Sequence, residues 1–122
     1  MLRYRLSAAA QSDIVEILSW SQRQFGAAAR RRYERLIVSA LQDLATNPDR
    51  AGSRARPELG AGARSWHLRL SVTRAGSGAG RVRTPRHFIV YRMEDTGVLA
   101  IGRVLHEAMD VEDRIPGEEP WG

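Results

Sequence analysis

Two amphipathic helical segments separated by a single glycine constrain the fold of this chain more than any other feature. In residues 8–25 and 27–45, apolar side chains recur at the spacing of one helix face. Ser7 stands where an N-cap is needed, Gly26 can leave the right-handed helical region, and Asn47-Pro48 ends the second segment. Because the connection is so short, we expect the helices to pack as an antiparallel hairpin.

Segments with strand periodicity flank this hairpin. Residues 2–6 precede it with one alternating face, and residues 65–72 show the clearest two-residue alternation in the chain. Residues 86–93 are apolar on both faces, which predicts a central strand, and a turn at 94–97 joins them to a strand at 98–105. We therefore predict a two-layer α+β fold with an N-terminal strand, an antiparallel helical hairpin and a three-stranded antiparallel meander.

The length and the remaining segments predict one domain. The chain has 122 residues, a size typical of a single domain. Residues 49–62 read as a loop, and residues 74–85 read as a long, flexible, basic loop. We place the domain at residues 1–114 and an acidic C-terminal tail at 115–122.

Composition excludes several classes of protein and site. There is no cysteine, which excludes a disulfide framework, a thiolate metal site and a cysteine nucleophile. No apolar run approaches the roughly 18 residues of a membrane span. The first residues alternate arginine with apolar side chains, unlike a signal peptide. We expect a cytoplasmic protein without membrane contact.

Charge is distributed unevenly along the chain. All 19 Lys and Arg residues are arginine, and the net charge is +5. Residues 50–92 hold ten arginines and one acid, whereas residues 107–122 hold six acids and one arginine. A basic middle predicts an anionic partner, either nucleic acid or an acidic protein segment.

No familiar catalytic motif is present. The chain lacks lysine, so a phosphate-binding loop of the usual kind is absent, and the histidine spacing fits no known metal site. Neighbouring strands could bring His67 and His87 together. Arg103 interrupts an apolar strand and needs a partner if buried, which could be a structural carboxylate or a ligand. Glu94, Glu107 and Asp110 are available as carboxylate partners for the arginines. We expect neither a metal nor a cofactor.

Several short motifs, in their order and spacing, carry a family resemblance. They are Tyr4-Arg5-Leu6-Ser7, Asn47-Pro48, Arg64-Ser65, the strand His87-Phe88-Ile89-Val90-Tyr91-Arg92, and Arg103-Val104-Leu105-His106 followed by Met109-Asp110. Over residues 3–114 the chain resembles the ParE/RelE toxin superfamily of bacterial type II toxin–antitoxin systems, and the ParE branch is the better match. The resemblance implies a helical hairpin packed on an antiparallel sheet, and a cognate antitoxin bound in a hetero-oligomer.

The two branches of this superfamily imply different activities. RelE-like members cut mRNA on the ribosome, and several place an arginine where this chain has Phe88. ParE-like members poison DNA gyrase and block replication, and the ending Arg103 to Asp110 resembles theirs. The resemblance therefore implies a non-enzymatic gyrase inhibitor. Two alternatives stay open: a ribosome-dependent endoribonuclease using His106, Arg103 and Arg86, and a non-toxic partner that only supports repression by its antitoxin.

Site residues follow from these expectations. The predicted target-binding residues are basic side chains of the sheet and its loops: Arg64, Arg69, Arg81, Arg83, Arg86, Arg103 and His106. The predicted antitoxin-binding residues are apolar or aromatic side chains of the helical hairpin: Trp20, Leu36 and Tyr33. Their proposed role is binding, because arginine stays charged and is a poor proton donor.

Overall fold

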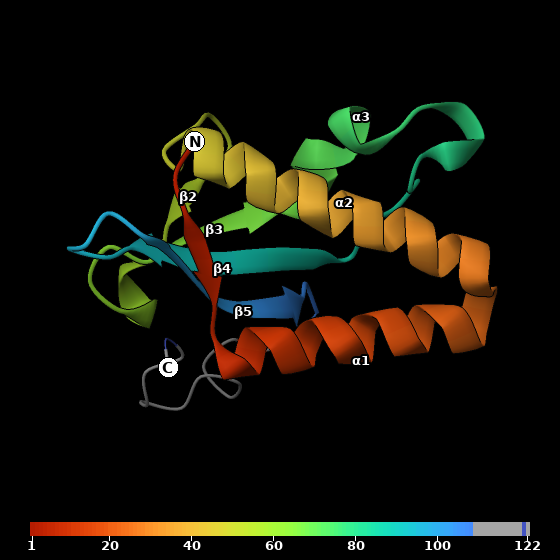
Figure 1. Cartoon of the computed structure of the whole chain (residues 1–122), viewed down its shortest axis with the longest axis horizontal. Helices are drawn as coiled ribbons and strands as arrows, with labels where there is room; N and C mark the ends of the chain where they lie inside the picture. Colours follow the sequence, from red (N-terminus) through yellow and green to blue (C-terminus); the bar gives the residue numbers. More distant parts are fainter. Residues whose placement is uncertain (109–120, 122) are drawn as a thin grey trace.

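The computed structural model describes residues 1–108 and Trp121, and it has the two-layer α+β architecture predicted from the sequence. Its helices are α1 (Ala8–Phe25), α2 (Ala27–Thr46) and the short α3 (Val72–Ala75). Its strands are β1 (Tyr4–Leu6), β2 (Arg54–Ala55), β3 (Arg64–His67), β4 (His87–Met93) and β5 (Leu99–His106). Figure 1 shows α1 and α2 side by side as a hairpin over one face of the sheet.

The helical hairpin is confirmed, together with its boundaries. The Ser7 hydroxyl accepts a hydrogen bond from the Ala10 amide at 3.0 Å and donates one to the Gly102 carbonyl at 2.7 Å. It thus caps α1 and ties the helix to β5. Gly26 has a φ of 92°, a conformation that glycine adopts without steric cost, so the chain reverses between α1 and α2 at this residue.

The sheet contains more strands than the sequence predicted. The described residues form a sheet of order β1-β5-β4-β3-β2, in which β1 runs parallel to β5 and the other pairs are antiparallel. The segment expected to be a loop at 49–62 contains β2 and a 3₁₀ turn at Pro57–Leu59. This expectation was wrong because β2 has only two residues, Arg54–Ala55, and a strand of that length shows no alternation in the sequence.

The strand predicted at 65–72 ends early. β3 stops at His67, and the chain continues as a 3₁₀ turn, Leu68–Ser71, and then α3. The Trp66 indole donates to the Ser71 hydroxyl at 3.0 Å, and this hydroxyl donates to Asp43 Oδ2 on α2 at 2.7 Å. These buried hydrogen bonds stabilise a turn in place of a continued strand, and Leu70 within the turn is 39% exposed.

Apolar clusters cover both faces of the sheet. The cluster beneath the helices contains large buried side chains, among them Leu36, Leu44, Ile89, Tyr91 and Ile101. The cluster on the opposite face contains Leu59, Ala63, Phe88, Val90, Ala100, Leu105 and Trp121. The central position predicted for residues 86–93 is therefore confirmed. Across the described residues, no helix combines the length and apolar character that crossing a membrane requires.

Of the predicted acidic tail, only Trp121 lies within the described residues. Its side chain is 4% exposed and lies against Gly102 of β5. A Cβ atom at Gly102 would come within 2.8 Å of the indole ring, so glycine is needed for this close packing. The Arg92 guanidinium stacks over the same ring, 4.6 Å from its centre. Of the predicted domain, residues 109–114 lie outside the described part of the chain.

Candidate functional site

The three histidines lie at one end of the sheet. His67 ends β3, His87 begins β4 and His106 ends β5. His87 is paired in register with His106, His67 is paired with Phe88, and the ring centres of His87 and His106 are 5.2 Å apart. The sequence suggested that His67 and His87 could meet, and the antiparallel register brings His106 to them as well. Within residues 1–108 and Trp121, no group of three or more His, Asp or Glu side chains is arranged to hold a metal.

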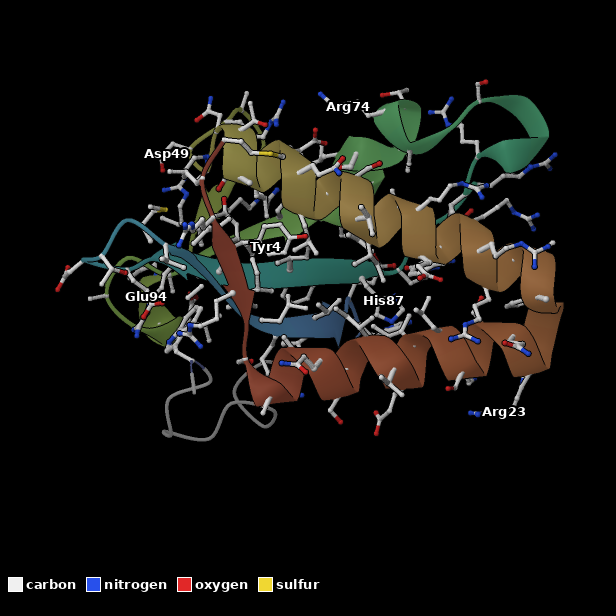
Figure 2. All side chains as sticks on the ribbon, viewed as in Figure 1. Tyr4, Arg23, Asp49, Arg74, His87 and Glu94 are labelled. Atoms are coloured by element: carbon white, nitrogen blue, oxygen red, sulfur yellow. The ribbon has the colours of Figure 1, made fainter. Side chains whose placement is uncertain are left out.

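His87 is bonded to Tyr33 of α2, and its ring is neutral at neutral pH. The Arg86 amide donates to the Tyr33 hydroxyl at 3.2 Å, and this hydroxyl lies 2.6 Å from His87 Nδ1. The Tyr33 hydroxyl and His87 Nδ1 thus share one hydrogen bond, in which either atom can be the donor. Burial, followed by the nearby His106 and His67, lowers the pKa of His87 to about 4. Burial also raises the pKa of Tyr33 to about 12. Figure 2 labels His87 at this end of the sheet, away from Glu94.

Glu107 joins two donors from different strands. Its carboxylate accepts from Arg86 Nη1 at 2.9 Å and from His67 Nε2 at 2.8 Å. The hydrogen bond from Arg86, followed by that from His67, lowers the pKa of Glu107 to about 2. His67 Nδ1 accepts from the Arg69 amide at 3.1 Å, and His106 Nδ1 accepts from the Ala108 amide at 3.0 Å. In His67 and His106, Nδ1 is thus a hydrogen-bond acceptor, and Nε2 is the nitrogen that can donate.

Arg103 has the structural carboxylate partner that the sequence left open. Its Nε and Nη2 atoms bond to the two oxygens of Asp13 on α1, at 2.7 and 2.9 Å. The Val104 amide donates to the same carboxylate at 2.9 Å. The hydrogen bonds from Arg103 to Asp13 raise the pKa of Arg103. Sequence reasoning missed Asp13, whose only signal was an acid at the border of the apolar face of its helix.

A groove runs from the histidines along α1. It has a volume of about 960 Å³. Trp20 and Phe25 of α1, with Tyr33 of α2 and Val82, give it an apolar lining, and Arg86, His87 and His106 also line it. Trp20 is 51% exposed and meets Phe25 edge to face at 5.6 Å. Single exposed apolar residues are ordinary, whereas an exposed aromatic pair in a groove is typical of a binding surface.

Arginines border this groove. Arg23 lines the groove itself, and its label in Figure 2 lies at the outer end of α1. An adjoining hollow of about 580 Å³ shares Phe25, Tyr33 and Val82 and adds basic side chains. These are Arg32, Arg81 and Arg83. The site is therefore a largely apolar groove with a cationic border, and Glu16 is the one acidic residue among its described lining.

The predicted target-binding residues do not form one surface. Arg81, Arg83, Arg86 and His106 lie around the groove, and the exposed Arg69 follows His67. Arg64 lies at the other end of β3, where its Nε donates to the Ser53 hydroxyl at 2.7 Å, and Arg103 is paired with Asp13. Of the predicted antitoxin-binding residues, Trp20 and Tyr33 line the groove. Leu36 is fully buried in the core, where a partner cannot reach it.

Comparison with known proteins agrees with this architecture. The family model described as ParE toxin of type II toxin-antitoxin system, parDE, matches residues 4–111. The chain is 36% identical over 110 residues to Toxin ParE1 of Mycobacterium tuberculosis strain CDC 1551 / Oshkosh, covering 90% of this chain and 94% of the relative. Toxin ParE1 of strain ATCC 25618 / H37Rv matches with the same identity and coverage. The chain belongs to the ParE toxin family of type II toxin–antitoxin systems.

Proposed function

We propose that this chain arrests bacterial growth by binding DNA gyrase and trapping its cleaved-DNA state, and that a cognate antitoxin neutralises it. One observation carries the proposal: the described residues form an apolar groove with a cationic border. A surface of this kind binds an acidic protein segment or a DNA-bearing protein surface. Membership of the ParE toxin family supports the same activity.

The histidine cluster is better suited to binding than to bond cleavage. Cleavage of RNA requires a base for the 2′-hydroxyl and an acid for the leaving oxygen. With a pKa of about 4, His87 is not protonated at neutral pH, and its Nδ1 faces Tyr33. The residues of the ribonuclease alternative are also divided, because Arg103 bonds to Asp13 and Arg86 bonds to Glu107. His106 alone does not supply both proton transfers.

The groove is the surface on which we place the antitoxin. An amphipathic antitoxin segment would set its apolar face against Trp20, Phe25 and Tyr33 and its acidic side chains against the bordering arginines. We expect Trp20→Ala to weaken antitoxin binding about tenfold or more, because large aromatic side chains dominate such interfaces. The control is Val38→Ala, which removes an apolar side chain of similar exposure, 42%, from α2 outside the groove lining.

The test of the gyrase proposal is a supercoiling and DNA-cleavage assay with the antitoxin-free chain. We expect loss of supercoiling together with accumulation of cleaved DNA. Replacing Arg81 and Arg83 by alanine should weaken inhibition, whereas Arg54→Ala, which removes an exposed arginine from β2, should not. Growth arrest in cells with unaffected gyrase would overturn the proposal. Transcript cleavage abolished by His106→Ala would then favour the ribonuclease alternative.

A further inference from the structure

Two donors from different strands converge on one carboxylate in this chain. Arg86 precedes β4 and His67 ends β3, and both bond to Glu107, one oxygen each, at 2.9 and 2.8 Å. The Glu107 amide also donates to the Arg86 carbonyl at 2.7 Å, which fixes the backbone beside the pair. Each oxygen of the carboxylate accepts one hydrogen bond. Two oxygens of a phosphate group could accept the same two hydrogen bonds from Arg86 and His67.

The donors are positioned by contacts that do not involve the Glu107 side chain. His67 Nδ1 accepts from the Arg69 amide, so its Nε2 proton must point to the carboxylate. The backbone of Arg86 is held by the hydrogen bond from its amide to Tyr33. These contacts hold the His67 ring and the backbone of Arg86 whether or not the carboxylate is present.

The pair is accessible from solvent. The side chain of Arg86 is 60% exposed and that of Glu107 is 36% exposed, whereas the His67 side chain is 12% exposed and reaches the site only through Nε2. Water and salt weaken exposed ion pairs, so an external anion can compete with Glu107 at little cost. The low pKa of Glu107 shows that Arg86 and His67 together favour a negatively charged oxygen at this position.

The surroundings favour a nucleotide phosphate. Arg86 also lines the groove that contains the exposed aromatic side chains Trp20 and Phe25. Arg81 and Arg83 border the adjoining hollow. Cationic side chains beside exposed aromatic rings bind the backbone and the bases of single-stranded nucleic acid.

We propose that Arg86 and His67 form a binding site for a nucleic-acid phosphate, and that Glu107 occupies this site in the free chain as an internal competitor. The inference rests on the proposed function, because the phosphate is taken to belong to the DNA that gyrase holds. Displacement of Glu107 by the incoming phosphate would then accompany target binding.

The experiment measures binding of a fluorescent single-stranded DNA oligonucleotide to the full-length chain at low salt. Glu107→Gln removes the charge and keeps the shape of the side chain. We expect binding to tighten about three- to tenfold, the effect of removing one like charge near a phosphate in a solvent-screened site. Adding Arg86→Ala to this variant should abolish the gain. Competition by inorganic phosphate would identify the phosphate group as the ligand, and competition by double-stranded DNA would show whether the bases contribute.

A matched control separates site occupancy from overall charge. Glu94→Gln removes the acid that bonds to Arg5 at 3.0 Å at the opposite end of the sheet, so it changes net charge equally. We expect no tightening in this variant. Unchanged binding in Glu107→Gln, or an equal gain in Glu94→Gln, would overturn the inference. Because the assay contains no gyrase, it can fail while the gyrase proposal stands, and the reverse is also possible.

Discussion

Arg103 shows why a charged residue inside an apolar strand cannot be assigned a role from sequence alone. The sequence indicated that this arginine needs a partner, and the structure supplies Asp13, 90 residues away along the chain. An arginine held by two hydrogen bonds to one carboxylate is positioned by the fold. We infer that it holds α1 against β5.

Replacing Asp13 by alanine should lower the free energy of unfolding by about 2–4 kcal/mol. The substitution leaves the part-buried Arg103 and the Val104 amide without their acceptor. Urea denaturation measures the change. Asp95→Ala, at an exposed position of the β4–β5 turn, is the control. A loss below about 0.5 kcal/mol would contradict this role, because surface ion pairs contribute that little.

His87 should make the protein sensitive to mild acid. Its pKa is about 4 in the folded chain against an ordinary value of 6.5, so the unfolded chain binds the proton more tightly. The stabilisation is complete above about pH 6.5 and is lost as the pH falls toward 4. Between pH 7 and pH 5 we expect a loss of about 1–2 kcal/mol.

Unfolding free energies of the wild type and of His87→Phe at the two pH values test this prediction. The variant should lose less stability than the wild type on acidification. Glu107 changes stability in the same direction but at lower pH, because its pKa of about 2 lies below the ordinary value of 4.5. Equal acid sensitivity in both proteins would show that other groups control the response.

At the scale of elements, helix ends and the turn after β3 decide how the layers join. The Ser7 cap was predictable, since an N-cap must lie next to its helix. Its second bond, to the Gly102 carbonyl, was not, because it links positions 95 residues apart. The same reason explains the failed strand at 65–72: the partners of Trp66 and Ser71 include Asp43 on another helix.

Ser7→Ala should therefore destabilise the fold more than the loss of an ordinary helix N-cap does. It removes the bond to the Ala10 amide and leaves the buried Gly102 carbonyl without this donor. We expect a loss of about 1.5–3 kcal/mol in the free energy of unfolding. Ser12→Ala, at an exposed position of the same helix, should change stability by less than about 0.5 kcal/mol. Similar values for the two variants would contradict the double role of Ser7.

At the scale of the whole molecule, Trp121 completes the apolar cluster on the sheet face opposite the helices. We expect Trp121→Ala to lower the free energy of unfolding by about 2–4 kcal/mol, because it uncovers a buried surface. The same substitution at Trp20, which is 51% exposed, should have a much smaller effect on stability. Thermal unfolding of both variants measures the contrast. Equal stabilities would mean that Trp121 does not contribute to the folded core.

The sequence by itself determined the helical hairpin, the strands on either side of it and the family resemblance. These features depend on periodicity, caps and short motifs, which are local along the chain. Tertiary structure alone decided the parallel pairing of β1 with β5, the meeting of Glu107 with Arg86 and His67, and the separation of Arg103 from the groove. These depend on register and on partners far apart in sequence, and residue spacing carries no signal for either.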